Sequence, residues 1–129
     1  MTAVKTALIT GASRGLGLAL ARELADAGWR LVIDAREADA LEMTRSELAR
    51  KTDVVAVPGD VADDAHRRQL MAMAGRLDVL VNNASVLGPS PQPALAEYPL
   101  DVFEQVYAVN VLAPLGLIQL AVREGLTEC

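Results

Sequence analysis

The chain has 129 residues, of which 52% are hydrophobic, 3% aromatic and 22% charged, and its formal net charge is −5. This length predicts one domain, residues 1–129, and the hydrophobic fraction suffices for an aliphatic core. The acidic balance argues against nucleic-acid binding, because no basic stripe is present to neutralise phosphates. The densest basic pair, Arg67-Arg68, is explained by a solvated helix face.

Cysteine usage and hydropathy favour a soluble cytoplasmic protein that does not bind a membrane. The single cysteine, Cys129, is the last residue, so the sequence offers no internal disulfide. Residues 1–10 lack the basic start and long apolar region of a signal peptide. The most apolar stretch, 108–122, contains Asn110 and Pro114 and falls short of a membrane span.

Hydrophobic periodicity predicts strands that alternate with helices along the chain. Strands are expected at 4–10, 30–35, 53–58 and 77–81. Helices are expected at 16–27, at 37–51, from an N-cap at Asp63 to about 75, and, after a proline-rich loop at 88–99, at 100–126 with a kink at Pro114. Such alternation indicates β-α-β units. The predicted fold class is α/β, a partial doubly wound, Rossmann-like parallel sheet with four strands in order 3-2-1-4, flanked by helices.

A glycine-rich turn joins the first expected strand to the first expected helix. It runs from Thr10 to Gly17, Thr-Gly-Ala-Ser-Arg-Gly-Leu-Gly. Backbone without Cβ atoms allows a pyrophosphate to approach, and the following helix offers unpaired N–H groups and its positive dipole end. The context therefore favours dinucleotide binding over a plain turn, although the spacing Gly-x3-Gly-x-Gly differs from the standard G-x-G-x-x-G fingerprint.

The end of the second strand carries residues of opposite charge that bear on the choice of dinucleotide. An acidic residue there would bind the free ribose 2′-hydroxyl of NAD, and an arginine would pair with the 2′-phosphate of NADP. The sequence offers both, as Asp34 and Arg36, and Asp34 lies at the right distance from the glycines for NAD.

Four motifs together resemble the short-chain dehydrogenase/reductase family over nearly the whole chain. They are Thr10–Gly17, Asp60-Val61, Asn82-Asn83-Ala84-Ser85 and Asn110. The family's usual string at the third motif is Asn-Asn-Ala-Gly, so Ser85 is a departure. The resemblance implies a nicotinamide dinucleotide cofactor and hydride transfer between nicotinamide and an alcohol or carbonyl substrate.

The resemblance also assigns cofactor-binding residues. They are Thr10, Gly11, Ser13, Arg14, Gly15, Leu16, Gly17, Arg36, Asp60, Val61, Asn83 and Ala84. Asp60 would bind the adenine amine and Val61 would pack on the ring. NADP(H) is favoured over NAD(H), because family members with Arg at position 36 use it for the phosphate and because Arg14 stands where NADP-preferring members carry a basic residue. In that alignment Ala35, rather than Asp34, takes the discriminating acidic position.

Plainer interpretations of the same residues remain open. Arg36 could be a solvated residue at a helix start, Asp60 a turn residue after Pro58-Gly59, and Asn82-Asn83 an ordinary turn.

Asn110 is the one residue of the chain that the resemblance places in the catalytic set. Pro114 lacks the N–H that would bond the carbonyl of Asn110, so this carbonyl is free to accept elsewhere. In the family an asparagine here holds a water of a proton relay through its main-chain carbonyl. The alternative is that Asn110 and Pro114 only shape a bend.

The family's catalytic Ser and Tyr-x-x-x-Lys are missing from the sequence. Tyr98 is followed at the fourth position by Val102 and Tyr107 by Val111, and the last lysine is Lys51. An unshifted tyrosine is a poor base at neutral pH, so its lysine is needed. We therefore expect a truncated domain that is inactive alone. The single histidine, His66, is expected on a helix surface without a catalytic role, and no metal site is expected.

Two other readings of the function stay open beside the oxidoreductase. The chain could be a non-catalytic nucleotide- or partner-binding module, or a truncated product without function. A fourth strand at the sheet edge and a long apolar helix would leave hydrophobic surface uncovered. We therefore expect a homo-oligomer, or association with a partner, through the sheet edge and the long helix.

Overall fold

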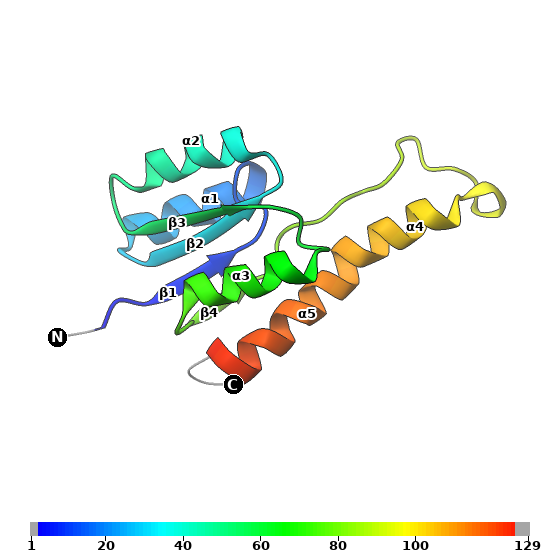
Figure 1. The fold of residues 1–129 in the computed structure, drawn as a ribbon. Helices are drawn as coiled ribbons and strands as arrows, with labels where there is room; N and C mark the ends of the chain where they lie inside the picture. The colour runs from blue at the N-terminus through cyan, green and yellow to red at the C-terminus, as the bar shows by residue number, and fades with distance from the viewer. Residues whose placement is uncertain (1–2, 126–129) are drawn as a thin grey trace.

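The computed structural model describes residues 3–125, which form a four-stranded parallel sheet between two layers of helices (Figure 1). The strands are β1 (Thr6–Ile9), β2 (Arg30–Ala35), β3 (Val54–Pro58) and β4 (Val79–Val81). Their order is β3-β2-β1-β4, which confirms the predicted order 3-2-1-4. The chain crosses from one side of β1 to the other between β3 and β4, so a crevice is expected where the ends of β1 and β4 meet.

The sheet is buried on both faces because its apolar side chains alternate between two helix layers. Ala7 and Ile9 of β1 face α1 (Gly15–Asp26) and α2 (Ala38–Leu48). Leu8 faces the opposite way, toward α3 (Asp64–Ala74) and α5 (Ala113–Leu120). The core is therefore aliphatic, as the composition predicts.

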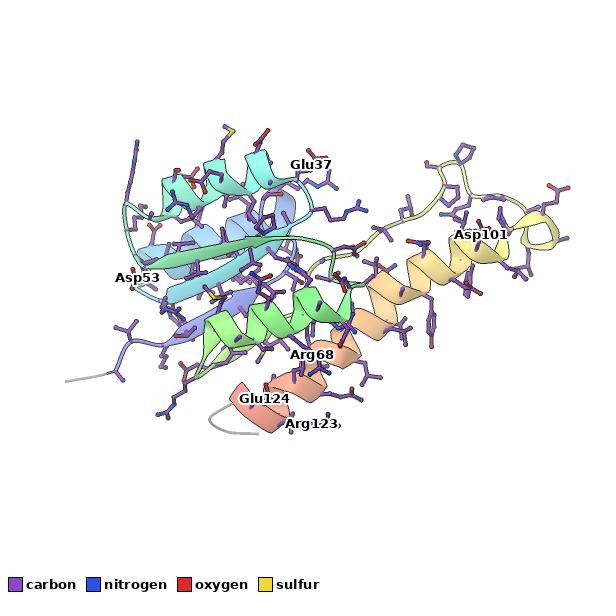
Figure 2. All side chains as sticks on the ribbon, viewed as in Figure 1. Glu37, Asp53, Arg68, Asp101, Arg123 and Glu124 are labelled. Atoms are coloured by element: carbon purple, nitrogen blue, oxygen red, sulfur yellow. The ribbon has the colours of Figure 1, made fainter. Side chains whose placement is uncertain are left out.

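Helix α3 has the ends that its sequence predicts. The carboxylate of Asp63 accepts a hydrogen bond from the amide of Ala65 at 3.1 Å, so Asp63 is the N-cap. Gly75 follows the helix with a φ of 62°. The pKa of the Asp64 carboxyl is lowered, chiefly by the hydrogen bond from Arg68. The hydrogen bond to Asp64 raises the pKa of Arg68, and Glu124, which Figure 2 labels nearby, adds to this shift.

The last third of the chain is one long helical run with two π-helical stretches. It consists of α4 (Leu100–Tyr107), a π-helical stretch (Ala108–Leu112), α5 and a second π-helical stretch (Ala121–Gly125). Pro114 is the second residue of α5, two positions after the first π-helical stretch ends. A proline has no N–H to donate, and the wider π-helical turns lie just before it. The predicted end at Leu126 and the cysteine Cys129 lie outside the described residues.

Only one side of this long helix is covered. Its inner side buries Leu117, Leu120 and Ala121 against α3 and the sheet, and Ala113 near Val61. An outer stripe is exposed along the whole run, and Figure 1 shows α4 extending away from the sheet. The outer stripe comprises Leu100, Phe103, Tyr107, Val111, Leu112, Leu115, Ile118 and Val122, which are 44–78% exposed.

The long helix also has the length and composition of a membrane span, contrary to the expectation for 108–122. Leu100–Glu124 contains a window with a mean hydropathy of 1.6, of which 28% is buried. A helix that combines a core side with an apolar outer stripe gives the same values. The hydropathy is therefore weak evidence for a membrane segment.

Candidate functional site

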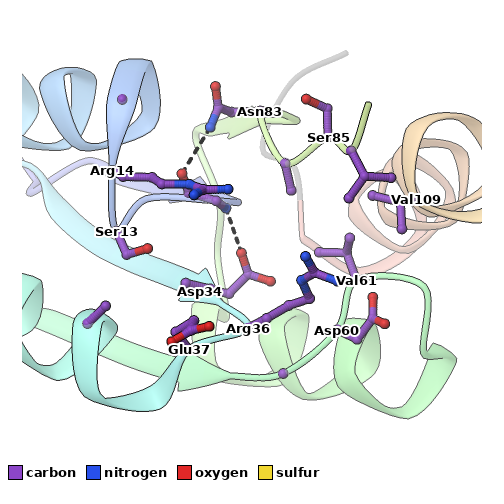
Figure 3. Close-up of a pocket in the computed structure, with 17 residues that line it drawn as sticks. Ser13, Arg14, Asp34, Arg36, Glu37, Asp60, Val61, Asn83, Ser85 and Val109 are labelled. Carbon is purple, nitrogen blue, oxygen red and sulfur yellow. Dashed lines mark hydrogen bonds between the residues drawn. The ribbon is translucent and has the colours of Figure 1, made fainter. Parts of the chain in front are cut away.

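A pocket of about 950 Å³ opens where the carboxyl ends of the four strands meet (Figure 3). Its lining comes from the glycine turn, from the segments that follow β2, β3 and β4, and from the long helix. The lining residues are Gly11, Ser13, Arg14, Gly15, Asp34, Ala35, Arg36, Glu37, Ala40, Gly59, Asp60, Val61, Asn83, Ala84, Ser85, Val86 and Val109. Ligands of open α/β sheets bind at this edge of the sheet.

The glycine turn is compact because side chains are excluded at particular positions. Gly11 and Gly15 have φ values of 64° and 58°, in the left-handed region that favours glycine. Gly17 lies under the turn, where a Cβ would come within 2.4 Å of the Gly11 carbonyl oxygen. Gly17 therefore lets the first turn of α1 pack directly on the backbone of Gly11.

The N-terminus of α1 is free to receive an anion. Arg14 is its N-cap and makes no side-chain capping bond, and the first turn contains no acidic residue. The N–H groups at this end therefore have no side-chain acceptor within the turn. They lie beside the part of the pocket that Ser13 and Gly15 line. The donor set and its dipole suit a pyrophosphate.

Hydrogen bonds between Thr10 and Asn83 join the ends of β1 and β4. The Thr10 hydroxyl accepts from the amides of Asn83 and Ala84 at 3.0 and 2.9 Å. The Asn83 side-chain amide donates to the carbonyls of Thr10 and Gly11, both at 3.0 Å. Thr10 is 2% exposed and does not line the pocket. It acts on the pocket only by holding the backbone around it.

Asp34 is not available to a ribose, although its distance from the glycines suggested the NAD interpretation. Its side chain is 2% exposed, and both carboxylate oxygens have partners. One oxygen accepts from the Gly11 amide at 2.8 Å, and the other lies 2.8 Å from Nε2 of His66. Asp34 therefore holds the glycine turn from below.

His66 is buried, which corrects the expectation of a surface histidine on α3. The residue is 5% exposed, and its ring faces β2 rather than solvent. It packs against Gly59, where a Cβ would lie 2.3 Å from Nδ1. The helical spacing of His66 with Leu70 and Ala74 places it on the inward side of α3, and this spacing was the available signal.

Arg67 is also less exposed than expected of a solvated basic pair. Its side chain is 13% exposed, and Nη1 donates to the Val61 carbonyl at 2.7 Å. The guanidinium lies against Gly116 of α5, where a Cβ would come within 2.7 Å of Nε. Arg67 thus fixes the pocket wall at Val61 to the long helix.

Charged side chains of both signs line one end of the pocket. Figure 3 shows Arg14 above the turn and Arg36 reaching toward Val61, with Glu37 and Asp60 nearby. Asp60 accepts from the Ala62 amide at 2.9 Å, as in the turn that the plainer interpretation describes, while it also lines the pocket. The two arginines and Asp60 therefore line the same pocket.

Ser85 lines the pocket, and Asn110, which does not line it, lies in the π-helical stretch of the long helix. The Asn110 side chain accepts from the Val86 amide at 2.9 Å and donates to the Val86 carbonyl at 2.8 Å. It thereby ties the segment after β4 to the π-helical stretch, and its neighbour Val109 lines the pocket. Ser85 needs no left-handed backbone, because no described residue other than glycine has a positive φ.

Most of the residues predicted to bind cofactor meet in the pocket. Three do not line it: Thr10 and Gly17, which are buried, and Leu16, which is 77% exposed. Sequence reasoning missed Glu37, Ala40, Gly59, Val86 and Val109 as lining residues. All except Ala40 directly neighbour a motif residue in the sequence, and that adjacency was the available signal.

Known proteins resemble the chain in sequence and in fold. Residues 5–127 match the family described as short chain dehydrogenase. The rhamnolipid-biosynthesis 3-oxoacyl-[acyl-carrier-protein] reductase of Pseudomonas aeruginosa is 40% identical over 119 residues, 89% of this chain and 45% of that protein. L-sorbose reductase from Gluconobacter frateurii, solved with NADPH and L-sorbose, is 30% identical with a TM-score of 0.85, over 94% of this chain and 47% of the reductase.

A solved structure with NAD⁺ instead of NADPH has the same fold. An NAD⁺-bound xylitol dehydrogenase is 26% identical with a TM-score of 0.82, over 93% of this chain and 47% of that protein. The chain thus spans about half the length of the relatives it matches. The family match over residues 5–127 and the motifs that meet in the pocket lead to one conclusion: the chain belongs to the short-chain dehydrogenase family.

Proposed function

We propose that the chain, as a single domain of residues 1–129, binds a nicotinamide dinucleotide in this pocket and prefers NADP(H) to NAD(H). The family reaction, hydride transfer between nicotinamide and an alcohol or carbonyl group, is the activity that this binding serves. One observation carries the proposal: Arg14 and Arg36 line the pocket, while Asp34 is buried and engaged beneath the turn.

The pyrophosphate is assigned to the turn and the start of α1. The amides around Gly15 and the side chain of Ser13 lie at the pocket wall, and Arg14 adds positive charge at the same place. A phosphate there gains from the helix dipole and from donors that no side chain caps.

The 2′-phosphate of NADP(H) is assigned to Arg14 and Arg36. A guanidinium presents paired N–H groups that match phosphate oxygens, so each arginine favours the phosphate over a free hydroxyl. The sorbose reductase was solved with NADPH and the xylitol dehydrogenase with NAD⁺, so the preference rests on the side chains of this chain. Asp34, Glu37 and Asp60 also line the pocket, so the preference rests on the paired N–H groups of the two guanidiniums and not on a net positive charge of the lining.

The remaining parts of the dinucleotide are assigned along the pocket. Asp60 and Val61 would take the adenine, and Asn83 and Ala84 would border the ribose on the nicotinamide side. Asn110 would then stand beside the reacting end and position the Val86 backbone. Bound nicotinamide would give or accept the hydride. The sequence contains no Tyr-x-x-x-Lys, so we expect the 129 residues alone to bind without turnover.

Titration of the chain with NADPH and NADH, by fluorescence and by calorimetry, tests the proposal. We expect saturable binding of both with tighter binding of NADPH. No binding of either at millimolar concentration would contradict it. Turnover is not expected of the 129 residues alone. Turnover of any alcohol or carbonyl compound in a panel assayed with the bound cofactor would therefore favour an oxidoreductase over the alternative, a non-catalytic nucleotide-binding module, and would contradict the expectation of binding alone.

The exposed surfaces suggest how the chain associates. The outer stripe of the long helix and the edge strand β4 are apolar and uncovered within residues 3–125. Uncovered apolar surface of this extent favours self-association. We propose a homo-oligomer that uses these surfaces, and a cytoplasmic location, which fits the acidic composition and the single cysteine.

A further inference from the structure

We propose that His66 is a positioning residue that sets the cofactor preference by holding the Asp34 carboxylate beneath the glycine turn. The charge of this carboxylate is thereby kept away from the part of the pocket that would receive a 2′-phosphate. The inference rests on the proposed dinucleotide binding, and it assigns to His66 the engagement of Asp34 on which the proposed preference for NADP(H) depends.

The geometry leaves Asp34 no free oxygen. Oδ1 accepts from the Gly11 amide at 2.8 Å, and Oδ2 lies 2.8 Å from Nε2 of His66. A carboxylate can only accept, so Nε2 carries the hydrogen that joins the two side chains. Asp34 is 1% and His66 5% exposed, so water does not replace either partner. The pair connects α3 to the turn through the end of β2.

Gly59 makes the space that the histidine ring needs. The three atoms nearest to a Cβ at this position are Nδ1, Cε1 and Cγ of His66, at 2.3, 2.7 and 2.8 Å. The backbone of Gly59 does not lie in the left-handed region, so an alanine is excluded here by the ring and not by the backbone conformation. Asp34, Gly59 and His66 therefore form one unit.

Loss of the histidine would release charge into the pocket. Asp34 is part of the pocket wall and stands two residues before Arg36. A buried carboxylate oxygen without a donor is costly, and rotation toward the pocket relieves the cost. In that position the carboxylate would repel a 2′-phosphate and could accept from the 2′-hydroxyl of NAD(H).

The experiment compares NADPH and NADH dissociation constants at pH 8, where a carboxyl group in contact with solvent is ionised. His66→Ala should lower the preference for NADPH about tenfold, through weaker NADPH binding and stronger NADH binding. His66→Gln should keep the preference, because the Gln amide can donate to Asp34 from a similar position. Leu70→Ala is the matched control: it removes a fully buried side chain from the same helix, and it should destabilise the chain without changing the preference.

Two further variants test whether the preference changes because the Asp34 carboxylate is released or because the fold is destabilised. Gly59→Ala should lower the preference as His66→Ala does, because its Cβ displaces the ring, and it should have no added effect in the His66→Ala background. Asp34→Asn should keep the preference, and in that background His66→Ala should leave it unchanged, because no charge remains to be released.

Amide exchange at Gly11 gives a readout that needs no cofactor. Exchange should be faster in His66→Ala and Gly59→Ala than in the unaltered chain and in Leu70→Ala, compared at equal global stability. If His66→Ala and Gly59→Ala both leave the preference for NADPH and the exchange at Gly11 unaltered, the inference is overturned while dinucleotide binding stands. Failure of the unaltered chain to bind either dinucleotide would contradict the proposed function, and the role in selectivity with it.

Discussion

The side-chain amide of Asn83 lies 3.0 Å from the carbonyl oxygens of both Thr10 and Gly11. One side chain after β4 thereby holds two successive peptide groups at the start of the glycine turn. The same nitrogen would be 2.5 Å from a Cβ at Gly17, so the amide fills the space that this glycine leaves. The shape of the turn thus depends on a residue more than seventy positions away in the sequence.

Asn83→Ala should destabilise the chain by about 1–3 kcal/mol, because it removes both donors from part-buried carbonyls. It should weaken NADPH and NADH binding by similar factors, because the turn is assigned to the pyrophosphate, which both cofactors contain. Urea denaturation and paired titrations measure the two effects. Asn82→Ala, at the exposed neighbouring position, is the control and should change stability by less than about 0.5 kcal/mol. A selective loss of one dinucleotide in Asn83→Ala would contradict this role.

The strand order and the pocket edge were predictable because their signals are local. Apolar strands that alternate with amphipathic helices specify a parallel sheet, and the glycines at 11, 15 and 17 mark its first turn. The strand ends then meet at one edge, so residues such as Arg36 and Val61 share a pocket although they are distant in sequence.

The buried polar contacts were less accessible from sequence. Asp34 and His66 are 32 positions apart and belong to different elements, so no single window contains both. Charged neighbours on α3 suggested a surface, while the helical spacing of His66 with Leu70 pointed inward. The burial of Arg67 could not be predicted from its neighbours in sequence either, because it depends on Gly116 of the distant helix α5.

Arg36→Ala should weaken NADPH binding about tenfold or more and leave NADH binding nearly unchanged, because the guanidinium is assigned to the 2′-phosphate. Titration of both cofactors at fixed ionic strength measures the effect. Arg68→Ala removes the same charge from α3 outside the pocket lining and should change neither affinity by more than a small factor. If Arg36→Ala weakens the binding of NADPH and NADH equally, Arg36 contacts the pyrophosphate or stabilises the fold and does not bind the 2′-phosphate.

Gly116→Ala should destabilise the chain by about 1–3 kcal/mol, although alanine is the better helix former, because its Cβ would meet the Arg67 guanidinium at 2.7 Å. The effect should disappear or reverse in the Arg67→Ala background, where the space is free. Urea denaturation of the four chains of this cycle gives the coupling free energy. Additive changes would show that Arg67 does not pack on α5 as described.

The outer stripe should drive self-association. Leu115 and Ile118 lie at its centre, are 49% and 46% exposed, and make little contribution to the core. Leu115→Lys combined with Ile118→Lys should therefore shift the chain toward monomer in sedimentation velocity, with little change in its unfolding midpoint. Met43→Lys adds a charge at an exposed apolar position of α2, in the other helix layer, and should leave association unchanged. If the unaltered chain sediments as a monomer at all concentrations, or if both variants associate equally, the stripe is not the contact surface.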